Sequence, residues 1–252
     1  MPLKAGIDTG AMNTAIVLLD GDEILTTLVV GSNEFLSSPR AFLEKMLESA
    51  KREWRALESV TATGRGRNGI DLARKKSSEV VCQARGALWL FPAARTVLNL
   101  GAESSRVVSI DEAGRVKSFA TNDKCAAGSG LFFDSIAQLM DVSLEDMGNL
   151  ALKAERTEEV SSRCAVFAES EVISHIHRGV SKESILSGLH HAVVDRIMDL
   201  LSKAAVEPDV VVTGGVARNP AVTGELSEKL GLALCLPAEP RIVGAIGAAL
   251  LE

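Results

Sequence analysis

The sequence contains no tyrosine, and aromatic residues make up only 4% of its 252 residues. It therefore lacks the side chains for a base-stacking platform or for an aromatic belt at a membrane interface. No apolar run reaches the roughly 18 residues that predict a membrane-spanning helix. Lys and Arg number 27 against 33 Asp and Glu, and the net charge of −6 disfavours polyanionic partners. We expect a cytoplasmic protein that binds neither nucleic acid nor membrane.

Cysteine is also scarce. The four thiols are separated by 43, 39 and 71 residues, so no pair has the close spacing of a zinc knuckle, and we expect no disulfide framework. Free cysteines are usually small buried hydrophobes. Cys82 and Cys235 lie in apolar helix and strand patterns, and we assign both to the core. Cys125 and Cys164 lie in different surroundings.

A repeated pattern of elements is present. Three strands joined by polar turns, then a helix and a further strand, are predicted over 4–8, 14–20, 23–30, 40–57 and 59–63. Three strands recur over 95–100, 106–111 and 116–120. This internal duplication predicts an α/β protein of two lobes, residues 1–93 and 94–252.

The second half is mostly helical. Apolar stripes predict helices around 131–140, 167–176 and 185–204, and a β-branched run predicts a buried strand over 210–212. A small-residue helix is predicted over 244–251, where it can pack tightly against the first lobe.

Glycine turns follow several predicted strands. Asp8-Thr9-Gly10 can hold a phosphate on backbone N–H groups while the carboxylate organises Mg²⁺, although the same turn suits an ordinary hairpin. Gly101-Ala102 occupies the equivalent turn of the second half, and Gly214-Gly215-Val216 follows the buried strand. The recurrence of such turns on a duplicated fold favours a nucleotide site.

Cys125 and Cys164 each precede a predicted helix N-terminus, where the helix dipole stabilises thiolates. Two thiolates cannot complete a four-thiolate cluster, so a second subunit across a two-fold axis would supply the other two. Two unrelated free cysteines, or a shared zinc ion, are the alternatives.

Several segments closely resemble the ATPase activators of 2-hydroxyacyl-CoA dehydratases and the ATPase subunits of ATP-dependent benzoyl-CoA reductase. They are residues 63–68, 122–130, 162–174, 213–219 and 244–249. The resemblance implies the duplicated actin and sugar-kinase fold (ribonuclease H-like), with ATP or ADP and Mg²⁺ between the lobes. It also implies one 4Fe-4S cluster shared by two subunits, with Cys125 and Cys164 as its ligands.

The resemblance further assigns roles at the nucleotide site. Asp8 and Glu103 would be catalytic. The residues expected to contact the nucleotide are Asp8, Gly10, Ala11, Met12, Asn13, Gly101, Ala102, Gly128, Ser129, Gly130, Gly214, Gly215, Val216, Asn219 and Gly244. The implied partners are an identical or paralogous ATPase subunit, an acyl-CoA reductase or dehydratase component, and a ferredoxin- or flavodoxin-type electron donor.

Two departures from the family pattern bear on catalysis. Ala11-Met12-Asn13 stands where the family usually has Ser-Thr and then a Lys or Ser on the second strand, and Asn99 and Ala102 replace the expected second acid and glycine. Loss of one preorganised charge costs about two to three decades in rate, so we expect weakened nucleotide binding and slow or absent hydrolysis. The pattern resembles the second of two paralogous ATPase subunits or a divergent homodimeric activator. A non-catalytic nucleotide-binding subunit and a small-molecule kinase are the alternatives.

The remaining charged clusters carry less information. Four histidines fall within 175–191, but the spacing of the first pair places them on different helix faces and disfavours a metal site. Glu169 and Glu171 are expected to be surface acids. The basic cluster within 65–76 is either a solvated face or a docking surface for an acidic partner.

Overall fold

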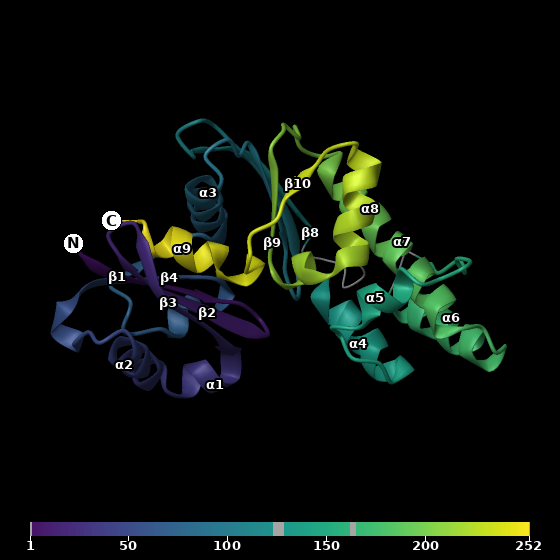
Figure 1. Ribbon diagram of the computed structural model, residues 1–252, viewed down its shortest axis with the longest axis horizontal. Helices are drawn as coiled ribbons and strands as arrows, with labels where there is room; N and C mark the ends of the chain where they lie inside the picture. The colour runs from purple at the N-terminus through teal and green to yellow at the C-terminus, as the bar shows by residue number, and fades with distance from the viewer. Residues whose placement is uncertain (1, 123–128, 162–164, 252) are drawn as a thin grey trace.

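The computed structural model describes residues 2–122, 129–161 and 165–251. Cys125, Gly128 and Cys164 lie outside these ranges, so their predicted roles stay predictions. Within the described ranges the chain forms two five-stranded mixed sheets, seen side by side in Figure 1. The first contains β1 (Leu3–Thr9), β2 (Asn13–Asp20), β3 (Glu23–Gly31), β4 (Leu57–Thr63) and β5 (Lys75–Lys76). The second contains β6 (Thr96–Leu100), β7 (Ser105–Ile110), β8 (Val116–Asn122), β9 (Val210–Thr213) and β10 (Leu234–Cys235).

The predicted duplication is present in the strand order. The sheets run β3-β2-β1-β4-β5 and β8-β7-β6-β9-β10, with antiparallel meanders and parallel β1–β4 and β6–β9 pairs. Asp8 pairs with Thr63 in one sheet, and Asn99 pairs with Thr213 in the other. Asp8 and Asn99 therefore occupy equivalent positions. The predicted boundary between residues 93 and 94 stays a prediction.

The helices are α1 (Ser32–Ser37), α2 (Pro39–Ser49), α3 (Glu79–Leu90), α4 (Gly130–Met140), α5 (Met147–Ala151), α6 (Ala165–His177), α7 (Lys182–Leu201), α8 (Pro220–Leu230) and α9 (Val243–Ala249). Short 3₁₀ helices are η1 (Trp54–Ala56), η2 (Arg65–Gly69), η3 (Gly215–Arg218) and η4 (Pro240–Ile242). The predicted helix over 40–57 was too long, because Lys51 adopts a positive φ of 54° that ends α2. The helices α1, α5 and α8 were not predicted, being short or weakly amphipathic.

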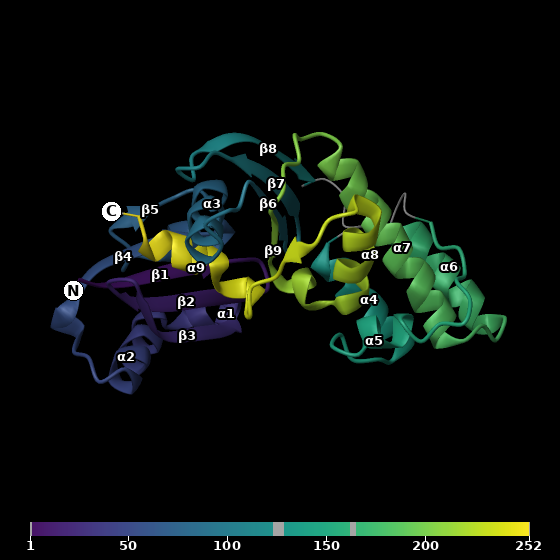
Figure 2. The ribbon, with the colours of Figure 1, turned by 45° about the horizontal axis from the view of Figure 1, so that its top comes forward.

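The last helix packs against the first sheet. The helix α9 contacts α3, β1, β2 and β4, and both views show it beside α3 (Figures 1 and 2). The approach depends on glycine, because a Cβ at Gly86 would lie 2.0 Å from the Val243 carbonyl oxygen and one at Gly247 1.7 Å from that of Cys82. This crossing brings the C-terminal segment to the strand that carries Asp8.

One sequence assignment to the core needs correction. Cys82 is fully buried, but Cys235 is only partly buried because it lies on the two-residue edge strand β10. In the predicted stripe of α6, Val172 is buried whereas Phe167 is 65% exposed. The stripe on α6 therefore does not belong entirely to the core.

Candidate functional site: a nucleotide cavity between the two sheets

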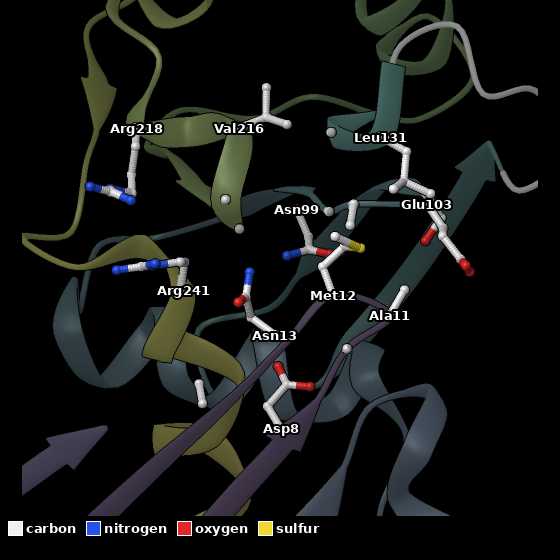
Figure 3. A pocket seen from close by; sticks show the side chains of 18 of the residues that line it. Asp8, Ala11, Met12, Asn13, Asn99, Glu103, Leu131, Val216, Arg218 and Arg241 are labelled. Atoms are coloured by element: carbon white, nitrogen blue, oxygen red, sulfur yellow. The ribbon is translucent and has the colours of Figure 1, made fainter. Parts of the chain in front are cut away.

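A cavity of about 470 Å³ opens between the two sheets. Its walls come from the β1–β2 and β6–β7 turns, the first turn of α4, and η3 (Figure 3). Of the residues expected to contact a nucleotide or act on it, those that line the cavity are Asp8, Gly10, Ala11, Met12, Asn13, Gly101, Ala102, Glu103, Gly130, Gly214, Gly215, Val216 and Asn219. Ser129 is buried immediately before Gly130, and Gly244 lies behind Asp8.

Asp8 lies at the floor of this cavity, near the end of β1 (Figure 3). Desolvation by the surrounding protein raises the pKa of Asp8 to about 7; the negative charge of Glu79 adds to this rise and Arg106 opposes it. A Cβ at Gly244 would lie 2.0 Å from Asp8 Oδ2, so only glycine allows α9 to approach this carboxylate. The carboxylate is thus charged above about pH 7 and forms part of the cavity lining.

The glycine turns that follow β1 and β6 close in the same way. Gly10 N donates to Asn13 O and Gly101 N donates to Ser104 O, each at 3.0 Å. The first turn is also held from α1, where Ser32 Oγ donates to Gly10 O at 2.8 Å. The two halves therefore present matched, backbone-closed turns to one cavity, and their binding of phosphate stays a prediction.

Equivalent glycines follow the parallel strand of each sheet. Gly64 and Gly214 both have φ 88° and ψ 174° and lie immediately before η2 and η3. A Cβ would lie 2.3 Å from Thr9 O at Gly64 and 2.3 Å from Leu100 O at Gly214. The positive φ and the close backbone approach both require glycine. The two halves therefore have the same backbone conformation at the edges that face each other.

The second half differs from the first at the base of the cavity. Asn99 Nδ2 donates to Thr213 Oγ1, and Thr213 Oγ1 donates to Gln83 Oε1, each at 3.0 Å. All three side chains are buried and none carries a charge. A closed neutral network therefore stands where the family pattern has a carboxylate.

Gln83 was missed by the sequence analysis, as were two ion pairs. Glu79 at the start of α3 pairs with Arg106 of β7, and both line the cavity. Arg65 of η2 pairs with Glu103 of the β6–β7 turn and so joins the two halves across the cavity mouth. Glu103, expected to be catalytic, thus has a cationic partner. The separations of 27 to 130 residues leave no local signal for any of these contacts.

Two further arginines lie together at one side of the cavity (Figure 3). Arg241 forms a two-point hydrogen bond with Glu239, at 2.8 and 2.6 Å, which raises the pKa of Arg241. Arg218 ends η3 and is exposed. Glu239 balances the charge of Arg241, so Arg218 is the arginine that adds positive charge to this side of the cavity.

The helices that follow the two cysteine segments in the sequence are joined to the cavity and to each other. Gly130 N donates to Gly101 O at 2.9 Å, and Leu131 N donates to Ala102 O at 2.8 Å, so the first turn of α4 rests on the β6–β7 turn. Ser135 Oγ of α4 donates to Glu169 Oε1 of α6 at 2.8 Å. Contacts therefore run from the nucleotide cavity to α6, which begins one residue after Cys164.

Other candidates have structural partners. Glu171, expected to be a surface acid, accepts from Ser161 N at 2.6 Å. In the basic cluster, Arg67 Nη1 donates to Gly64 O at 2.8 Å and Lys76 Nζ to Asn68 O at 3.0 Å, so both hold the η2 loop. Across the described ranges no group of three His, Cys, Asp or Glu side chains is placed to hold a metal ion, and no helix is long and apolar enough to cross a membrane.

The fold and the cavity define a two-lobed nucleotide-binding protein of the actin and sugar-kinase type. A glucokinase from Streptomyces griseus with bound glucose and AMPPNP shares the fold, with a TM-score of 0.57 at 13% identity over 98% of each chain. The model of the BadF/BadG/BcrA/BcrD ATPase family matches residues 5–251, and the chain belongs to this family.

Relatives with known roles are similar over almost the whole chain. The activator of lactoyl-CoA dehydratase from Anaerotignum propionicum is 38% identical over 97% of this chain and 95% of its own. One of the subunits of benzoyl-CoA reductase from Thauera aromatica is 33% identical over 99% and 93%. The activator of 2-hydroxyisocaproyl-CoA dehydratase from Clostridium difficile, with bound ADPNP, superimposes with a TM-score of 0.92 at 33% identity, over 98% and 92%. The chain is therefore similar to dehydratase-activating ATPases and to part of a reductase.

Proposed function

We propose that the protein is an ATP-coupled electron-transfer subunit. It binds ATP in the cavity between the two sheets and holds half of a 4Fe-4S cluster through Cys125 and Cys164. The observation that carries the proposal is the position of α4, whose first turn rests on the β6–β7 turn and begins shortly after Cys125. The ADPNP in the C. difficile activator supports the nucleotide, and the dehydratase and reductase relatives support the electron-transfer role.

The nucleotide part of the proposal uses residues of both halves. The backbone of the Gly10 and Gly101 turns holds the phosphates, and Asp8 organises Mg²⁺ through water. The cavity volume of about 470 Å³ is in the range of small-molecule and cofactor sites. The nucleoside then binds at the side of the cavity that contains Arg218 and Arg241.

The cluster part requires a second subunit, identical or paralogous. One chain supplies two cysteine thiolates and a 4Fe-4S cluster needs four ligands, so the two-fold axis of a dimer passes through it. Bound there, the cluster supplies one-electron chemistry at low potential. The partner that accepts the electron is an acyl-CoA reductase or a 2-hydroxyacyl-CoA dehydratase, and the donor is a ferredoxin- or flavodoxin-type protein.

Coupling between the sites runs through the chain's own helices. A change at the phosphates moves the β6–β7 turn, which α4 follows through its hydrogen bonds to Gly101 and Ala102. The helix α6 follows α4 through the Ser135–Glu169 hydrogen bond. A nucleotide-dependent shift of these helices alters the surroundings of both cysteines together.

The proposal is tested by purifying the protein without oxygen and recording its absorption and electron paramagnetic resonance spectra. A brown protein whose signal appears on reduction and changes on addition of MgATP is the expected result. A protein that is colourless, and that iron and sulfide do not reconstitute even beside its paralogue, overturns the proposal.

A nucleotide-binding subunit that does not hydrolyse ATP is the second candidate, and the neutral Asn99–Thr213–Gln83 network favours it. The replacement Asn99→Asp restores a carboxylate opposite Asp8 and is expected to raise ATP turnover at least about tenfold, since one preorganised charge is restored. Turnover is measured by phosphate release at saturating MgATP. Asn149→Asp, on the exposed side of α5, is the matched control and should leave turnover unchanged. An unchanged rate in Asn99→Asp would show that the missing charge does not limit hydrolysis.

A further inference from the structure

His190 is a buried titratable side chain that no step above uses. It lies in the middle of α7, is 2% exposed, and contacts two residues of the cavity wall. Its Nε2 lies 2.9 Å from Asn219 Nδ2, and its ring centre lies 5.0 Å from that of Phe133 in α4. It therefore supports the nucleotide cavity from behind.

The hydrogen bonds around His190 fix which of its nitrogens carries the proton. Nδ1 lies 2.6 Å from the carbonyl oxygen of Leu186, which can only accept, so Nδ1 is protonated. Asn219 Oδ1 caps α8 by accepting from Ala221 N at 3.1 Å and Val222 N at 3.3 Å, which directs Nδ2 to the ring. Nε2 must then accept from Nδ2, and the neutral ring with hydrogen on Nδ1 is the one form that satisfies every partner.

The backbone of α5 lies close to the Asn219 side chain. A Cβ at Gly148 of α5 would lie 2.4 Å from Asn219 Oδ1, so the backbone of α5 closes the third side. The backbone of Asn219 also ends η3, with its N donating to Val216 O at 3.0 Å. The side chain of Asn219 thus links the cavity wall formed by η3 to α5, α7 and α8.

We propose that His190 is a positioning residue for the nucleotide: its neutral ring holds the Asn219 amide so that η3 and the start of α8 form the correct wall of the cavity. The inference rests on the proposed nucleotide binding. When Nε2 is protonated, the Nε2–H and Asn219 Nδ2–H groups are both donors and repel each other. Either the Asn219 amide then turns, so that Oδ1 no longer caps α8, or the contact between Asn219 and His190 opens. Nucleotide affinity is therefore lower when His190 is charged.

The surroundings of His190 define the pH range. Burial holds the pKa of His190 below its ordinary value of 6.5, and the hydrogen bonds to Leu186 and Asn219 oppose this. The charged or titratable groups that act on it are Glu225 of α8, which favours protonation, and His191 of its own helix, which disfavours it. From α4 the Phe133 ring lies against it, and the described residues of α5 include no titratable side chain. Weakening is therefore expected on the acid side of the ordinary histidine pKa and not at neutral pH.

The test measures MgADP affinity by calorimetry from pH 5 to 8. His190→Leu should bind about tenfold more weakly than wild type at pH 7.5, because the Asn219 amide loses its acceptor. His190→Gln, which keeps an acceptor that does not titrate, should bind within about threefold of wild type at pH 7.5 and lose the fall at acid pH. His177→Gln, at the exposed histidine that ends α6, is the matched control and should behave as wild type.

A variant of Asn219, the hydrogen-bond partner of His190, gives a result that a packing role for His190 does not predict. Asn219→Asp retains an oxygen to cap α8 but accepts from a protonated ring, so it should raise the pKa of His190 above that of wild type and make MgADP bind more tightly as the pH falls. Nuclear magnetic resonance of the imidazole nitrogens reports that pKa and the tautomer without ligand. Equal affinity of wild type and His190→Leu, or an acid-pH fall that His190→Gln retains, overturns the inference alone. No MgADP binding by wild type at any pH overturns it together with the proposed function.

Discussion

Replacing Cys125 or Cys164 by serine is expected to abolish the iron–sulfur cluster and leave a colourless protein. Each substitution removes one ligand from both subunits of a homodimer, so two thiolates remain where four are needed. Serine does not substitute, because its hydroxyl stays protonated at neutral pH and binds iron weakly. The measurement is iron and acid-labile sulfide per chain after anaerobic purification, together with the visible spectrum.

Cys235→Ser is the matched control for this loss. Cys235 is partly buried on the edge strand β10, remote in sequence from both loops, and the variant should keep the wild-type iron content. In a heterodimer each of these substitutions leaves three cysteine ligands, so the expected result is a damaged cluster and not a complete loss of the cluster. Wild-type iron content in both Cys125→Ser and Cys164→Ser would refute their assignment as ligands.

Asp8→Asn is expected to lower ATP turnover by about two to three decades, the usual cost of removing a preorganised charge from a phosphoryl-transfer site. The raised pKa of Asp8, about 7, adds a pH signature: wild-type turnover should rise with pH through that value, and the residual turnover of the variant should not. Phosphate release from MgATP between pH 6 and 8.5 measures both. Asp22→Asn, in the exposed β2–β3 turn, is the control.

The same substitution has an opposite expected effect on stability. Because folding raises the pKa of Asp8, ionising this carboxylate costs more free energy in the native state than in the unfolded state. This penalty to the free energy of unfolding is absent below the unfolded pKa of 3.8 and complete above about pH 7. Asp8→Asn removes the penalty, and its thermal midpoint at pH 8 should exceed that of wild type. A variant with lower stability and unaltered turnover would show that Asp8 is a structural residue.

The duplicated fold could be predicted because its signals are local. Strand alternation, glycine turns and a β-branched run mark both halves, and the structure confirms the two-lobed α/β class. The equivalence of Gly64 and Gly214, with identical backbone angles, is the structural counterpart of that repetition. Helix ends and short elements were less accessible. The end of α2 depends on one residue at positive φ, and β10 exists only through pairing with β9.

The parts of the candidate site that are formed by backbone turns could be predicted from the sequence. The parts that are formed by tertiary contacts could not. Gly10 and Gly101 follow strands, so their convergence at one edge follows from the fold. Gln83 looks like one polar residue in an apolar helix, and its role appears only when Thr213, 130 residues later, lies beside it. Glu103 illustrates the converse: its assignment as catalytic comes from the resemblance, and its pairing with Arg65 depends on how the two halves meet.

The central claim is that two chains share one cluster whose ligands are Cys125 and Cys164, beside a nucleotide cavity in each. Iron counted per chain, with the molar mass of the same anaerobic sample from light scattering, tests it most directly. The account predicts about four iron atoms per dimer, or two per chain, formed either by this chain alone or with its paralogue. A monomer that holds a whole four-iron cluster, or a dimer that holds no iron after reconstitution in the presence of the paralogue, would contradict it.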